Sequence, residues 1–222
     1  MLNMDKKLLK REEEGKVIRV GIVGAGQMGR GMVTQMVLMK GITPAIVSDI
    51  KIENAVHAFK YAEVPDEEIV EAKTLEEANA AMEAGKYVAC EDANFVSQAN
   101  LVECVIDATG VPDVGAKVAT DAMRNKKHVV MLNVETDVVI GPYLKKLAEE
   151  EDEPGAVMHL YSFAKAMGLN VEVMGKGKNN KIDYDCNPDT VLEEATRRKM
   201  SPKMLCAFKD GTKTMVEMTA MS

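Results

Sequence analysis

A glycine-rich turn constrains the fold of this chain more than any other feature. The turn has the spacing Gly24-x-Gly26-x-x-Gly29. It follows the β-branched run 16–23 and precedes residues 30–40, in which apolar side chains recur at helical spacing. In such a turn the first glycine permits the bend, the second lets a diphosphate approach the backbone, and the third lets helix and strand pack closely. The sequence therefore predicts a strand, a turn and a helix whose N-terminus holds a dinucleotide, with a plain glycine turn as the alternative.

Strand and helix patterns alternate beyond this turn. Strands are expected at 44–49, 87–90, 102–110 and 128–135, with helices at 75–84, 114–125 and 141–150. Such alternation is typical of right-handed βαβ units and a parallel sheet covered on both faces. We predict an α/β fold with a doubly wound parallel sheet of the Rossmann type, followed by the start of a catalytic or dimerisation domain. The predicted divisions are a charged arm at 1–15, the dinucleotide-binding domain at 16–151 and the partial second domain at 152–222.

Composition excludes several classes of function. The 222 residues carry a formal net charge of −7, which disfavours binding to nucleic acid or to an anionic membrane. No apolar run approaches the roughly 18 residues that a membrane span requires, and the charged start does not resemble a signal peptide. The four cysteines form no C-x-x-C pair, and the three histidines are not spaced for a shared metal. We expect a cytoplasmic protein with reduced thiols and no zinc site.

Asp49 is the predicted ribose ligand. It ends the second strand, where a carboxylate accepts hydrogen bonds from the adenosine ribose and repels a 2′-phosphate. This favours NAD over NADP, although Lys51 partly offsets the repulsion. The alternative is a solvated loop carboxylate.

The ends of the next two strong strands supply further candidates. Ligands of open α/β sheets bind beyond the carboxyl ends of the strands, where the strand order reverses. The small residues Ala108 and Gly110 would let a dinucleotide cross the edge of the sheet. Asn133 and Glu135 would reach the nicotinamide. The alternative is that Asp107 and Asn133 cap the helices that follow. The full candidate set for the cofactor is Gly24, Gly26, Gln27, Met28, Gly29, Asp49, Ala108, Thr109, Gly110, Asn133 and Glu135.

Two clusters near the carboxyl end mix charged and polar residues. One is the lysine-rich loop 175–180, and the other is the turn and helix start at 210–217. Lys213 and Glu217 would share a helix face as an i, i+4 pair. Composition alone favours solvated surface for both clusters.

A family resemblance changes that interpretation. The segments 24–29, 106–110, 127–135, 175–180 and 210–218 together resemble the homoserine-dehydrogenase-like family, some members of which are described as 1-deoxy-D-xylulose 5-phosphate reductoisomerase-like. The resemblance implies a nicotinamide-dependent oxidoreductase that acts on a small hydroxy or keto substrate, which is phosphorylated in one branch. It also implies a homodimer or higher homo-oligomer.

The resemblance also implies roles for the candidate catalytic residues. Lys178 and Lys213 would stabilise the developing alkoxide and exchange its proton, and Lys176 would anchor a phosphate or carboxylate. Glu153, Asp210 and Glu217 would orient these lysines or hold a divalent cation, which is the second candidate cofactor besides NAD or NADP. The competing hypotheses are a non-catalytic NAD(P)-binding module for redox sensing or scaffolding, and a homoserine dehydrogenase proper.

The chain departs from the family pattern in three places. NADPH-using relatives carry a neutral or basic residue where Asp49 stands. An apolar strand is expected before Asp152, where this sequence runs from Glu151 directly into Asp152. The family pattern also continues beyond Ser222, usually into a SAF-type domain. We expect residues of the parent protein to be missing at the Glu151–Asp152 junction.

Overall fold

The computed structural model describes residues 4–148, 167, 181–198 and 200–221. The chain divides into two compact units, Met1–Thr136 and Asp137–Ser222, which are described separately. The predicted domain boundary and the Glu151–Asp152 junction lie outside the described residues.

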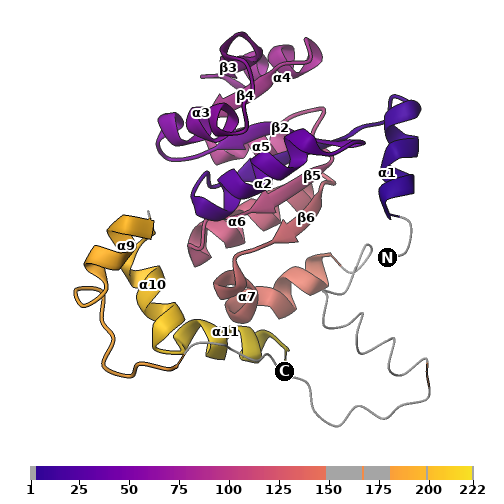
Figure 1. Ribbon diagram of the computed structural model, residues 1–222. Helices are drawn as coiled ribbons and strands as arrows, with labels where there is room; N and C mark the ends of the chain where they lie inside the picture. The colour runs from indigo at the N-terminus through magenta and orange to yellow at the C-terminus, as the bar shows by residue number, and fades with distance from the viewer. Residues whose placement is uncertain (1–3, 149–166, 168–180, 199, 222) are drawn as a thin grey trace. The chain divides into compact units, whose positions relative to one another are not determined.

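A six-stranded parallel sheet forms the centre of the first unit (Figure 1). Its strands are β1 (Ile18–Val23), β2 (Ile42–Ser48), β3 (Ile69–Glu71), β4 (Tyr87–Cys90), β5 (Cys104–Asp107) and β6 (His128–Met131). Their spatial order is β3-β4-β2-β1-β5-β6. β2 and β5 lie on opposite sides of β1, and all three strands are parallel. The chain therefore adds β2 to β4 on one side of β1 and then crosses to add β5 and β6 on the other side. The carboxyl ends of β1 and β5 therefore form the topological switch point.

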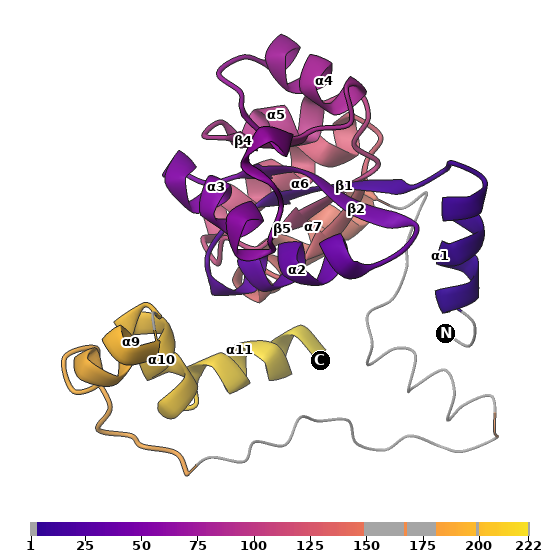
Figure 2. The same ribbon diagram turned by 45° about the horizontal axis from the view of Figure 1, so that its top comes forward.

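Helices cover both faces of the sheet (Figure 2). One apolar cluster joins the sheet to α2 (Gln27–Leu38) and α3 (Ile52–Tyr61). A second cluster joins it to α4 (Leu75–Glu83), α5 (Ala93–Gln98) and α6 (Pro112–Arg124). Gly21 lets α5 approach, because a Cβ there would lie 2.4 Å from a Val96 methyl carbon. The predicted doubly wound α/β fold is confirmed.

Two predicted boundaries were wrong near the end of this unit. The last strand ends at Met131 instead of continuing to Glu135, and α7 spans Val134–Leu147 instead of beginning near Gly141. Pro142 explains the second error. Proline is common in the first turn of a helix, which favoured a helix start near Gly141, but Pro142 lies inside α7. The short edge strand β3 and the 3-10 helix Asp66–Glu68 were not predicted.

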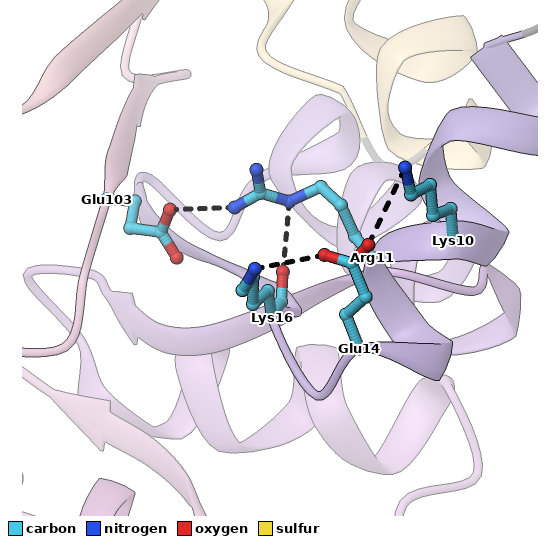
Figure 3. Close-up of polar contacts among 5 residues, drawn as sticks. All are labelled: Lys10, Arg11, Glu14, Lys16 and Glu103. Atoms are coloured by element: carbon cyan, nitrogen blue, oxygen red, sulfur yellow. Dashed lines mark hydrogen bonds and ion pairs between the residues drawn. The ribbon is translucent and has the colours of Figure 1, made fainter.

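The charged arm is a helix, α1 (Met4–Glu13), that is hydrogen-bonded to the amino-terminal end of the sheet. Arg11 Nη2 lies 3.2 Å from Glu103 Oε2, directly before β5, and Arg11 Nε donates to the Lys16 carbonyl (Figure 3). Glu12 Oε2 accepts a 2.7 Å hydrogen bond from Gly41 N, directly before β2. These contacts hold α1 at the end of the strands opposite to the switch point.

The described part of the second unit contains α7 from Asp137 onward and three further helices. These are α9 (Leu192–Arg198), α10 (Pro202–Lys209) and α11 (Thr212–Met221). A small core of Val191, Ala195, Leu205 and Cys206 joins α9 to α10. Ser201 is the N-cap of α10, and Asn187 Oδ1 accepts from Asp189 N and Thr190 N in a turn before α9. Among the helices that the structure describes, none combines the length and apolarity needed to cross a membrane.

Candidate dinucleotide site

The three glycines of the turn have different structural roles. Gly24 adopts φ +96°, and a Cβ there would lie 2.9 Å from the carbonyl atoms of Ala108. A Cβ on Gly29 would lie 1.8 Å from the Gly24 carbonyl oxygen. At Gly26, by contrast, no described atom lies within 4 Å of the Cβ position. Gly24 and Gly29 are therefore needed for packing, while Gly26 leaves space above the backbone.

The N-terminus of α2 opens into that space. Gly26 is the N-cap, and its carbonyl accepts the first helical hydrogen bond, from Arg30 N at 2.9 Å. The amides of Gln27, Met28 and Gly29 have no carbonyl to bond within the helix. The side chains of Gln27 and Met28 are exposed. Unpaired amides and the partial positive charge of the helix end provide the donors that a diphosphate requires.

Asp49 lies against the glycine turn, one residue after β2. Its Oδ2 accepts a 2.9 Å hydrogen bond from Ala25 N, inside the turn. Its Oδ1 accepts from Lys51 N at 3.1 Å and from Asn54 Nδ2 at 3.0 Å. A carboxylate has about four lone-pair positions, so these three bonds leave acceptor capacity at Oδ2 for a ribose hydroxyl. The carboxylate is thus anchored on both sides and stays partly exposed, and its role as a ribose ligand remains a prediction.

Asn54 is a supporting residue that the sequence analysis missed. It lies in the first turn of α3 and fixes the orientation of the Asp49 carboxylate. Its separation of five residues from Asp49 was the available signal, since a short turn followed by a helix brings such a pair together.

The loop after β5 lines the same crevice. Ala108 N donates to the Val23 carbonyl at 2.8 Å, which continues the pairing of β1 and β5 up to the glycine turn. Gly110 adopts φ +64°, a left-handed conformation that glycine accommodates without strain. Thr109 donates through both N and Oγ1 to Asp107 Oδ1, at 3.0 and 2.7 Å. The loop is therefore fixed to the end of β5 as well as to Gly24.

Asn133 and Glu135 lie at the start of α7. Asn133 is 1% exposed, and its Oδ1 accepts from Thr136 N at 3.2 Å, as expected for a helix cap. Its Nδ2 donates to the Val111 carbonyl at 2.9 Å. The capping alternative therefore holds for Asn133, whose contribution to a ligand site is to position the neighbouring loop. Glu135 lies in the first turn of α7 and is partly exposed.

The residues around the switch point fit a nicotinamide dinucleotide. The open position at Gly26 matches the close approach of a diphosphate, and Asp49 stands where the ribose of the adenosine half would lie. This fit rests on the backbone geometry of the loop and on the anchored carboxylate.

The candidate catalytic residues belong to the second unit. Asp210 follows α10, and its Oδ1 accepts from Thr212 N at 2.8 Å, which caps the first turn of α11. Lys213 and Glu217 lie four residues apart on α11, as predicted. Glu153, Lys176 and Lys178 lie outside the described residues. The roles of all five, together with that of Asp210, stay predictions.

Metal and thiol chemistry receive little support from the described residues. Within these ranges, no group of three His, Cys, Asp or Glu side chains is placed to hold a metal ion. All four cysteines are free thiols. Burial raises the pKa of the Cys90 thiol to about 12 and that of the Cys104 thiol to about 11. Burial is also the main reason that the pKa of Cys206 is raised to about 11. These three thiols are protonated, and therefore poor nucleophiles, at neutral pH.

Comparison with solved structures gives several weak likenesses. Scyllo-inositol dehydrogenase from Lactobacillus casei with bound NAD(H) is 16% identical at a TM-score of 0.46, over 69% of this chain and 41% of that one. A 3-ketoreductase from Actinomadura kijaniata in complex with NADP is 14% identical at a TM-score of 0.47, over 68% and 44% of the two chains. A putative myo-inositol dehydrogenase from Sinorhizobium meliloti is 14% identical at a TM-score of 0.46, over 68% and 42%. This chain thus spans less than half the length of these three proteins.

The sequence comparisons concern the carboxyl-terminal third. No curated protein matches the chain. Residues 151–222 match the family model described as "Oxidoreductase DRL, catalytic domain". This segment contains all six candidate catalytic residues. In it the chain is similar to the catalytic domain of an oxidoreductase.

Proposed function

We propose that this chain is a nicotinamide-dependent oxidoreductase that transfers hydride to or from a small hydroxy or keto substrate. The observation that carries the proposal is the turn at the N-terminus of α2. There Gly26 leaves open space, while the neighbouring Ala25 amide holds the Asp49 carboxylate. The oxidoreductase match at 151–222 supports the catalytic half of the proposal.

NAD is the preferred cofactor in this proposal. Asp49 keeps an acceptor position for a ribose hydroxyl, and its negative charge would repel a 2′-phosphate. When bound, the nicotinamide accepts or donates the hydride. The glycine turn and Asp49 bind the adenosine diphosphate half, and the loop after β5 orients the nicotinamide half.

The second unit supplies the groups that act on the substrate. Lys178 and Lys213 stabilise the developing alkoxide and hold or release its proton, and Lys176 anchors a phosphate or carboxylate of the substrate. Glu153, Asp210 and Glu217 orient these lysines or bind a divalent cation. The substrate branch is homoserine-dehydrogenase-like or 1-deoxy-D-xylulose 5-phosphate reductoisomerase-like. We further propose a cytoplasmic homo-oligomer with a domain division near Glu151.

The proposal is tested first by titrating the chain with NADH and NADPH and following cofactor fluorescence. We expect tighter binding of NADH. The second step assays turnover with a panel containing aspartate semialdehyde, small keto acids and keto sugar phosphates. Absence of nicotinamide binding would refute the proposal, and binding without turnover on this panel would favour the non-catalytic module.

Lys178→Ala separates catalysis from cofactor binding. We expect this variant to lose turnover while its NADH affinity stays within about twofold of the wild type, because the lysine acts on the substrate. Lys181→Ala, three residues along, is the matched control and should retain activity. Normal turnover in Lys178→Ala would remove the lysine from the mechanism.

A further inference from the structure

Four polar side chains, three of them buried, form a cluster at the carboxyl end of β5. They are Asp107 at the end of β5, Thr109 in the following loop, and Asn133 and Thr136 at the start of α7, and we call them the Asp107 cluster. Asp107 is 0% exposed, and Asn133 and Thr136 are each 1% exposed. A buried polar group normally has at least one hydrogen-bond partner, so we expect a partner for each polar atom of the cluster.

Hydrogen bonds connect the cluster to the backbone of the loop after β5. Thr109 N and Oγ1 both donate to Asp107 Oδ1, and Asn133 Nδ2 contacts Thr109 Oγ1 at 3.3 Å. Thr136 Oγ1 donates to the Pro112 carbonyl at 3.0 Å. The loop is thus held from β5 on one side and from α7 on the other.

One atom of the cluster is not satisfied. Among the described residues, Asp107 Oδ2 has no hydrogen-bond partner although it is buried. It lies 2.4 Å from the position that a Cβ would take on Gly115, where Thr136 Oγ1 and Asn133 Nδ2 also converge, at 2.3 and 2.6 Å. Gly115 therefore gives space to the carboxylate, yet nothing described bonds to its second oxygen.

The fold alone does not explain a carboxylate at this position. An unpaired buried carboxylate oxygen costs free energy, whereas an asparagine would accept the same two bonds from Thr109 without burying a charge. The charge is therefore retained at a cost to stability, and such costs are typical of functional sites.

The benefit of the charge lies in the position of the loop. Hydrogen bonds to an ionised acceptor are about twice as strong as those to a neutral one, so the carboxylate holds Thr109 more rigidly than an amide would. The backbone of this loop lies against Gly24, whose Cβ position is 2.9 Å from the Ala108 carbonyl. The cluster therefore fixes the surface that follows the glycine turn along the crevice.

We propose that Asp107 is a positioning residue, which holds the loop 108–111 in the geometry that the nicotinamide half of the dinucleotide requires. This inference rests on the proposed function. It adds that the glycine turn and Asp49 bind the adenosine diphosphate half independently of the Asp107 cluster. Binding of the two halves of the cofactor thus depends on different residues.

The test compares the binding of NADH with that of ADP, which lacks the nicotinamide half. For Asp107→Asn, which keeps both bonds from Thr109 but makes their acceptor neutral, we expect NADH affinity to fall about fivefold, the difference between a hydrogen bond to a charged group and one to a neutral group, while ADP affinity changes less than about twofold. The thermal midpoint of the variant should equal or exceed that of the wild type. Asp113→Asn, which removes an exposed charge from the first turn of α6, is the matched control and should leave both affinities unchanged.

Thr109→Val provides a second route to the same result. It removes the Oγ1 bond to Asp107 and leaves the carboxylate in place, so it decides the question if Asp107→Asn does not fold. We expect the same selective loss of NADH affinity. An unchanged NADH to ADP affinity ratio in both variants would overturn the positioning role and leave the proposed function standing, whereas a wild-type chain that binds no NADH would overturn both.

Discussion

Gly26→Ala is the substitution that most directly tests the proposed site. Gly26 has φ −66°, which any residue can adopt, and among the described atoms none lies within 4 Å of the added Cβ. The fold therefore loses only the preference for glycine over alanine at an N-cap, about 0.5–1 kcal/mol. Because 1 kcal/mol shifts the midpoint of a chain of this size by about 2–4 °C, the variant should remain folded.

The same methyl group would stand where the diphosphate approaches the backbone. Displacing the diphosphate breaks one of its hydrogen bonds to the amides of α2, and a bond to a charged group contributes about 1.5–3 kcal/mol. Affinity for NADH should therefore fall about tenfold to a hundredfold. The assay is a fluorescence titration with NADH, run beside a thermal unfolding curve of the same sample.

Two other glycines near the start of α2 provide the controls. A Cβ on Gly31 likewise meets no described atom within 4 Å, but it lies inside the helix, so Gly31→Ala should stabilise α2 by about 1 kcal/mol and leave binding unchanged. At Gly29 the Cβ would lie 1.8 Å from the Gly24 carbonyl oxygen, so Gly29→Ala should destabilise the fold by about 2–3 kcal/mol. Wild-type NADH affinity in Gly26→Ala would refute the assignment of this turn to the diphosphate.

Three further predictions concern other parts of the first unit. Asp49→Asn should weaken NADH binding and raise the NADPH to NADH affinity ratio about tenfold, because the repulsive charge is removed; an unchanged ratio in parallel titrations would exclude Asp49 as the discriminating group. Lys127 Nζ donates to the carbonyls of Ala99 and Val102 at 2.7 and 2.6 Å, so Lys127→Met should lower the free energy of unfolding by about 2 kcal/mol in urea, whereas Lys126→Met on the exposed neighbour should not. Since burial raises the pKa of the Cys90 thiol from 9.0 to about 12, its contribution to stability is complete below pH 9 and is lost as the pH rises toward 12; Cys90→Ala should make the measured decline in unfolding free energy shallower over that window, and an identical decline would contradict the shift.

Local patterns in the sequence determined much of the fold and the position of the glycine turn beside Asp49. The glycine spacing, the β-branched run before it and the helical spacing after it specify a strand, a turn and a helix by contacts among neighbouring residues. Asp49 was found for the same reason, because the end of the second strand lies at a set distance from the turn in a βαβ unit. The helix predicted at 75–84 likewise begins at a local signal, a capping box in which Thr74 Oγ1 accepts from Glu77 N at 3.2 Å.

The tertiary structure decided which distant segments share the switch point. Asp107, Gly115 and Thr136 carry no local pattern that joins them, and they converge only because β5 and β6 pair in register and α6 packs behind them. The same pairing turned Asn133 from a candidate cofactor ligand into a buried cap for α7. The pattern of side chains that specifies one helix or strand lies within a few neighbouring residues. Convergence of side chains from separate elements depends instead on how the whole sheet assembles, and no short stretch of sequence contains that information.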